Sequence, residues 1–118
     1  LGGCIYIYLQ AGDRDKALDV LRGIEGVDEA LAREDAAKKF HLMPGRIGDL
    51  MALGAPDVVF GDPQEVTMPP TLRSHGSLHE ERVPIIGYGG AFDGFEFNEN
   101  KDLGRFVFER VFASSPAR

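Results

Sequence analysis

The sequence predicts an α+β fold, in which strands and helices are mixed within a small chain. Short segments rich in Ile, Val and Tyr alternate along the chain with segments whose apolar residues recur at helical spacing. Clusters of Gly and Pro separate these segments and mark the turns. Together these patterns predict a βαβαββ lobe in residues 1–61, followed by a strand and a helix in residues 62–118.

The lobe begins with residues 4–9, whose Ile and Tyr content predicts a strand. Asp13 follows as a predicted N-cap, because its carboxylate can accept bonds from the free amides of a first helical turn. The helix is expected to end at Gly23 or Gly26. Its predicted apolar face is formed by Ala17, Leu18, Leu21 and Ile24.

The rest of the lobe consists of shorter elements. Residues 27–33 predict a second strand, residues 34–40 predict a short helix, and the Pro-Gly pair at 44–45 predicts a turn. Residues 46–53 and 57–61 predict two more strands, joined in the manner of a hairpin by the Gly-Ala-Pro sequence between them.

The second half begins with a proline-rich stretch, residues 62–72, which predicts irregular structure and a boundary between two subregions. Residues 83–88 predict a strand, and residues 89–98 are rich in Gly and Phe. Asn100 is the predicted cap of a final helix. The broad apolar stripe of this helix is formed by Leu103, Phe106, Val107, Val111 and Phe112.

Composition excludes several classes of function. The chain has 13 basic and 19 acidic residues, a net charge of −6 without a basic stripe, which argues against nucleic-acid binding. Every apolar run is far shorter than the roughly 18 residues that cross a bilayer. Cys4 is the single cysteine and is predicted to be a buried thiol, so a cytoplasmic protein is expected. Because the chain starts at Leu1 and opens on a strand, we expect an incomplete fragment.

The main chemical candidate is His75, in the loop Ser74-His75-Gly76-Ser77. Neutral imidazole is a common zinc ligand, and glycine allows close backbone approach or a positive φ. The alternative is a solvated side chain. His79 lies four residues later, a spacing that aligns two ligands on a helix, but Gly76 and Ser77 argue against a helix there. A solvated or hydrogen-bonded His79 is therefore expected.

Five segments of the chain are distinctive when they are taken together. They are Gly2-Gly3-Cys4-Ile5-Tyr6-Ile7-Tyr8-Leu9, Arg46-Ile47-Gly48-Asp49-Leu50, Val58-Val59-Phe60-Gly61, Ser74-His75-Gly76-Ser77 and Val83-Pro84-Ile85-Ile86. In this order, between residue 2 and about residue 90, they resemble the C-terminal part of phosphonoacetate hydrolase, a zinc-dependent family of the alkaline phosphatase superfamily, in its nucleotide pyrophosphatase/phosphodiesterase-like branch.

The resemblance implies a site with two zinc ions, a threonine or serine nucleophile, and Asp and His ligands spread along the full-length chain. His75 corresponds to the last of these ligands. Its neighbours Arg73, Ser74 and Gly76 are expected to orient it. The family's adjacent Asp-His pair and its nucleophile have no counterpart here, so no catalytic residue is expected and the isolated chain should be inactive. Residues 1–61 would be a cap-like lobe, and residues 62–118 the C-terminal segment of the alkaline-phosphatase-like catalytic domain.

The expected function is that of the C-terminal fragment of a zinc-dependent phosphonoacetate hydrolase, which cleaves the carbon–phosphorus bond of phosphonoacetate to give acetate and phosphate. A related dizinc phosphodiesterase or phosphatase is the enzymatic alternative, and a non-catalytic acidic interaction module is the other. The expected partners are a small phosphonate substrate and the missing N-terminal part of the enzyme, while a homodimer stays open. Nucleic acid and membrane are not expected partners.

Overall fold

The structure, a computed structural model, describes residues 2–61 and 67–113. It forms two compact units, residues 1–82 and 83–118. The α+β prediction is confirmed by a small antiparallel sheet combined with helices. Assigning residues 1–61 to a cap and residues 62–118 to a catalytic domain is a functional interpretation and stays a prediction.

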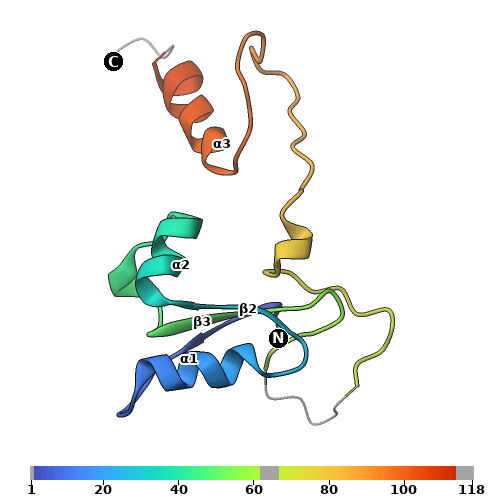
Figure 1. Ribbon diagram of the computed structural model, residues 1–118. Coiled ribbons are helices and arrows are strands. Elements are labelled where there is room, and N and C mark those ends of the chain that lie inside the picture. The colour runs from blue at the N-terminus through green and yellow to red at the C-terminus, as the bar shows by residue number, and fades with distance from the viewer. Residues whose placement is uncertain (1, 62–66, 114–118) are drawn as a thin grey trace. The chain divides into compact units, whose positions relative to one another are not determined.

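In its described residues, 2–61 and 67–82, the first unit contains three strands and two α-helices (Figure 1). The same residues include two single-turn 3-10 helices, η1 (Pro44–Arg46) and η2 (Leu78–Glu80). The main elements are β1 (Cys4–Ile7), α1 (Arg14–Arg22), β2 (Val27–Ala32), α2 (Arg33–Phe40) and β3 (Leu50–Gly54).

The sheet has the order β1-β3-β2, and both of its pairings are antiparallel. β3 is the central strand and is buried throughout. The predicted hairpin between residues 46–53 and 57–61 is therefore wrong, because β1 and β2 already occupy both edges of β3. Phe60 instead forms one antiparallel bridge with Gly2, through backbone bonds of 3.1 and 2.7 Å.

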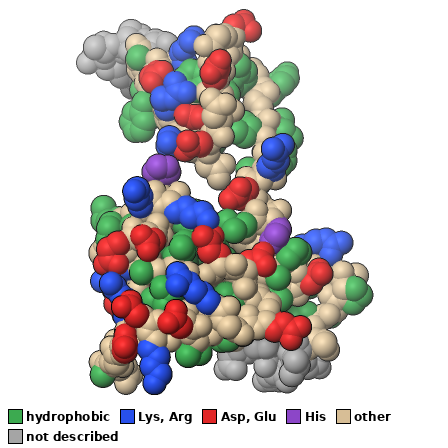
Figure 2. All heavy atoms as spheres, viewed as in Figure 1, with side chains coloured by type: hydrophobic (Ala, Val, Ile, Leu, Met, Phe, Trp, Pro, Cys, Tyr) green, Lys and Arg blue, Asp and Glu red, His purple; other side chains and the backbone are tan. Residues whose placement is uncertain are grey.

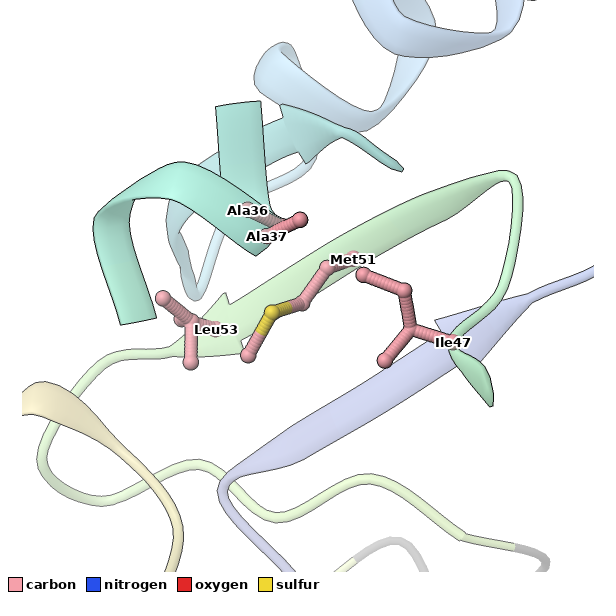
Figure 3. Packing of buried hydrophobic residues seen from close by; sticks show 5 residues of the cluster. All are labelled: Ala36, Ala37, Ile47, Met51 and Leu53. Atoms are coloured by element: carbon pink, nitrogen blue, oxygen red, sulfur yellow. The ribbon is translucent and has the colours of Figure 1, made fainter. Parts of the chain in front are cut away.

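Each face of the sheet is covered by one helix (Figure 1). Successive strand residues point to opposite faces, so β3 contributes alternately to two small cores. Leu50 packs with Leu18 of α1 and Ala30 of β2. Met51 and Leu53 face the other way and form a cluster with α2 and the turn before β3 (Figure 3). The members of that cluster are Ala36, Ala37, Ile47, Met51 and Leu53.

The ends of α1 follow from local chemistry. The Asp13 side chain accepts bonds from the amides of Asp15, at 3.0 Å, and Lys16, at 3.3 Å, as an N-cap should. Gly23 is the C-cap. The predicted helix is therefore confirmed, but its apolar face is narrower than expected, because Leu18 is buried while Ile24 is exposed beyond the last turn.

The second unit contains α3 (Lys101–Phe106), which continues as the π-helical turn η3 (Val107–Phe112). Asn100 makes no side-chain cap bond, contrary to prediction. Asp102, inside the first turn, instead ties the helix to the residues before it: its carboxylate accepts bonds from the amides of Asn98, at 2.8 Å, and Glu99, at 2.9 Å. The predicted strand at residues 83–88 is not formed, since that segment pairs with no strand in the described parts of the chain.

The surface has a mixed charge. Acidic and basic side chains are interspersed over the face shown in Figure 2. Single-sign patches of the kind that nucleic acid requires are not seen on that face. Within residues 2–61 and 67–113, no helix has the length and apolarity to cross a membrane.

Candidate functional site: the His75 loop

The loop of residues 74–77 lies directly against the start of β1. The amide of Gly3 donates a 2.7 Å bond to the carbonyl of His75. A Cβ added to Gly3 would lie 2.7 Å from both Cβ and N of Ser77, closer than real contacts allow, and one on Gly2 would lie 3.3 Å from the carbonyl oxygen of His75. Because two glycines precede β1, the two backbones can touch. The Gly2-Gly3 pair ahead of a strand is the sequence signal for this contact.

Gly76 also has a conformational role. Its φ of 96° lies in the left-handed region, which glycine adopts without the steric cost that a Cβ imposes. A Cβ at this position would be 3.5 Å from Cβ of Cys4, an ordinary contact, so the backbone angle is what requires glycine here. Of the two roles that the sequence left open for Gly76, the structure shows the positive φ.

Ser77 and Glu80 close the loop by a capping box. The Glu80 carboxylate accepts bonds from the amide of Ser77, at 2.9 Å, and from its hydroxyl, at 2.6 Å, while the Ser77 oxygen accepts the amide of His79 at 3.1 Å. These hydrogen bonds from Ser77 hold the pKa of Glu80 below its ordinary value, and the nearby imidazoles of His79 and His75 add to the effect. Glu80 is thus a structural acceptor rather than part of a solvated charge run.

The two histidines of this region have different environments. Nε2 of His79 lies 2.6 Å from a carboxylate oxygen of Asp28 on β2, so its ring is engaged in a structural pair, as the hydrogen-bonded alternative predicted. His75 is exposed, and its ring makes no hydrogen bond with the described residues. His75 is therefore the imidazole that remains available to a ligand, on a loop whose backbone is fixed on both sides.

The neighbours of His75 were expected to orient it. The Arg73 guanidinium here donates to the carbonyls of Pro70, at 3.2 Å, and Leu72, at 2.9 Å, which stiffens the segment before the loop. The hydroxyl oxygen of Ser74 is buried and has no hydrogen-bond partner among the described residues. Both residues line a cavity of about 640 Å³ between residues 56–59 and 67–74. Their assistance to His75 stays a prediction.

The segment Arg46-Ile47-Gly48-Asp49-Leu50 contributes packing rather than chemistry. A Cβ on Gly48 would lie 2.7 Å from the carbonyl oxygen of Ile7, so glycine lets this turn pass against the end of β1. The carboxylate of Asp49 accepts the amide of Leu9 at 2.8 Å and the Arg33 guanidinium at 2.6 Å. The bond from Leu9 ties the residues just after β1 to the turn before β3.

Cys4 and His41 are equally structural. Burial raises the pKa of the Cys4 thiol, which disfavours the reactive thiolate. His41 is the C-cap of α2 and adopts a left-handed conformation with φ of 55°. Cys4 is only partly buried, whereas the sequence predicted a buried thiol.

A structural zinc site needs four ligands, and a catalytic one needs three. The described residues hold no group of three or more His, Cys, Asp or Glu side chains that could bind a metal ion. They do offer one accessible, unengaged imidazole on a rigid loop. The residues present thus fit one ligand of a larger metal site, and they do not fit a complete site within this part of the chain.

Solved structures place this arrangement in a known context, although no family model matches the chain. Phosphonoacetate hydrolase from Sinorhizobium meliloti 1021, in complex with phosphonoacetate, is similar at 32% sequence identity and a TM-score of 0.58, over 66% of this chain and 20% of that chain. The same enzyme in complex with phosphonoformate is similar at 33% identity and a TM-score of 0.57, over 65% of this chain and 20% of that chain. A fragment of a phosphonoacetate hydrolase fits this chain. The present chain spans about a fifth of the length of the phosphonoacetate hydrolases it matches.

These similarities confirm the recognition made from the sequence segments, at the level of a fragment of a phosphonoacetate hydrolase.

Proposed function

We propose that this chain is part of a phosphonoacetate hydrolase and contributes His75 to its metal centre. The overall reaction would add water to phosphonoacetate: the carbon–phosphorus bond breaks, a phosphorus–oxygen bond forms, and the released carbon takes a proton, giving acetate and phosphate. The zinc requirement and the role of His75 rest on the resemblance of the Ser-His-Gly-Ser loop. The chain's similarity to phosphonoacetate hydrolase structures supports the substrate.

One observation carries the assignment to His75. The loop is fixed by its backbone bond to Gly3 and by the capping box of Glu80, while the imidazole itself is exposed and unengaged. A ligand side chain held in this way loses little further conformational freedom when it binds a metal, because its backbone is already ordered. Zinc, when bound, would neutralise charge on the phosphoryl oxygens and lower the pKa of an attacking oxygen.

The other residues of the loop have supporting roles under this proposal. Glu80 fixes the backbone after His75 through the amide and hydroxyl of Ser77. The pair between His79 and Asp28 ties the same turn to β2, so that the loop is anchored to the sheet at a second point. These contacts position His75 without touching the substrate.

The test compares two histidine variants in a full-length protein that contains this chain. His75→Ala should lose zinc and most phosphate release, whereas His79→Ala should keep its zinc, because its ring is engaged with Asp28. Changes around metal ligands cost about 10- to 100-fold in affinity or activity even when the ligand itself is kept, so loss of the ligand should exceed this range. Zinc is measured by elemental analysis and phosphate by a colorimetric assay.

The same preparations distinguish the enzymatic alternatives. Phosphonoacetate and a phosphodiester are offered in parallel, and hydrolysis of the diester alone would favour a phosphodiesterase. If His79→Ala loses zinc while His75→Ala keeps it, the ligand assignment is wrong. A full-length protein without either activity would favour an interaction module.

A further inference from the structure

Residues 83–88 form an extended apolar segment that the chain leaves uncovered. Ile86 is 91% exposed and Tyr88 is fully exposed, and Val83 and Ile85 are about half exposed. Within the described parts of the chain, no backbone group of this segment makes a hydrogen bond. An apolar segment whose side chains are exposed and whose backbone groups are unpaired is unusual on a protein surface.

The second unit does not use this segment for its own core. Phe106 is the buried centre of that core, and three phenylalanines of the preceding loop surround it. Their ring centroids lie 5.0 Å (Phe92), 5.1 Å (Phe95) and 5.6 Å (Phe97) from that of Phe106. The Arg105 guanidinium covers the Phe95 ring at 4.1 Å. The apolar side chains of residues 83–88 stay exposed beside this cluster, so they need another explanation.

The order of apolar residues in 83–88 indicates the kind of sheet in which this segment would be buried. In an extended strand, Val83 and Ile85 point to one face and Ile86 and Tyr88 to the other, so both faces are apolar. Strands that are apolar on both faces occupy the interior of sheets covered on both sides. Pro84 is compatible with this role because it lies near the strand's start. The described residues provide no such sheet, since the sheet of β1, β3 and β2 does not include this segment.

The end of the segment is held in place. A Cβ on Gly87 would lie 2.6 Å from Cζ of Phe92, so this glycine lets the aromatic cluster pack directly on the segment's backbone. The helical residues of the second unit carry further apolar side chains that are more than half exposed, namely Leu103, Phe108 and Phe112.

We propose that residues 83–88 are an interior strand of a sheet whose other strands lie in the part of a phosphonoacetate hydrolase that this chain does not contain. This inference rests on the proposed function, since about four fifths of the matched enzyme lies outside the match and can supply the sheet. The exposed residues of α3 and η3 then cover the completed sheet. A second copy is a poorer occupant, because pairing two such segments gives a two-stranded ribbon that leaves its apolar faces in water.

The test mixes the purified chain with the Sinorhizobium meliloti phosphonoacetate hydrolase shortened by the fifth that matches it. A one-to-one complex should form, with amides 85–88 newly protected from deuterium exchange. Ile86→Asp and Tyr88→Asp should each weaken the complex by about 100-fold or more, because a carboxylate would be buried without a partner. Both side chains are exposed in the free chain, so neither variant should unfold it.

Val20→Asp provides the matched control. Val20 is an exposed apolar residue of α1 in the first unit, and its replacement should change the dissociation constant less than threefold. A chimera, in which this chain replaces the matched fifth of the enzyme, gives a second measurement that does not depend on the shortened protein. Its amides 85–88 should be protected in the wild-type chimera and exposed in the Ile86→Asp chimera.

Each outcome separates the inference from the proposed function, because neither measurement uses zinc or turnover. Protection of residues 85–88 without hydrolysis would contradict the function and support the strand. Unprotected amides in the chimera, or a homodimer that Ile86→Asp dissociates, would refute the strand. Binding that Ile86→Asp and Val20→Asp weaken equally would also refute it.

Discussion

The contact between Gly3 and Ser77 gives the sharpest quantitative prediction. In Gly3→Ala the new Cβ would lie 2.7 Å from Cβ and N of Ser77, and ordinary contacts begin near 3.4 Å. One of the opposing atoms belongs to the backbone, so no rotamer change relieves the overlap. The two segments must therefore separate by several tenths of an ångström, which also stretches the bond from the Gly3 amide to the His75 carbonyl.

The expected cost follows from these two effects. Overpacking of this kind costs about 1–3 kcal/mol, and a weakened hydrogen bond costs about 0.5–1.5 kcal/mol. We therefore expect Gly3→Ala to lower the free energy of unfolding by about 2–4 kcal/mol. Urea unfolding followed by far-UV circular dichroism measures this quantity as a shift of the midpoint at constant slope.

Two further glycine variants make the measurement discriminating. Gly2→Ala places its Cβ 3.3 Å from the His75 carbonyl oxygen and should cost less than Gly3→Ala. Gly45→Ala meets nothing within 4 Å and should be neutral or slightly stabilising. If Gly3→Ala is as stable as Gly45→Ala, the loop that carries His75 does not lie on β1, and the account of its anchoring is refuted.

Three other predictions follow from single features. The chain alone should release no phosphate from phosphonoacetate and should bind zinc only weakly, because its described residues hold no group of three ligands; nanomolar affinity in a zinc titration would overturn this. His41→Gly should stabilise the chain by about 0.5–1 kcal/mol, since glycine removes the steric cost of the left-handed C-cap, and His41→Ala, measured in the same urea series, should not. The pKa of Asp102 is lowered by bonds from the amides of Asn98 and Glu99, so its stabilisation is full above the unfolded pKa near 3.9 and is lost as the pH falls through the lower folded pKa. In the wild type, NMR should show that amides 98 and 99 lose protection from hydrogen exchange in that acidic window. In Asp102→Asn, the protection of both amides should already be weaker at neutral pH and should not change with acid. Equal acid sensitivity in both proteins would contradict the assignment.

The elements that sequence reasoning predicted correctly are those with local causes. The α1 helix was placed to within a residue because Asp13 caps it through amides two and three positions away. The first two strands and the second helix likewise coincide with their local composition. The cap of α1 depends on neighbours a few residues apart, so the local sequence suffices to place this helix. Composition located β1 and β2, but both became strands by pairing with β3.

Two segments that were predicted to be strands did not join the sheet, because neither pairs with a strand among the described residues. Residues 57–61 follow β3 and have a suitable composition, but both edges of β3 are already paired. Residues 83–88 have strand composition and meet no strand in the described part of the chain. Whether an extended segment becomes a strand depends on the position of another backbone, which a local pattern does not contain.

The candidate site divides in the same way. The sequence by itself determined that His75 is followed by a glycine, which can adopt a positive φ, and that the loop resembles one family. The tertiary structure alone decided that the His79 ring is engaged by Asp28, fifty-one positions away, while the His75 ring makes no hydrogen bond with a described residue. It also decided that Gly2 and Gly3 are needed for contact with residues 75–77. Hydrogen bonds and steric contacts act over a few ångströms, so only folding reveals which distant residues they join.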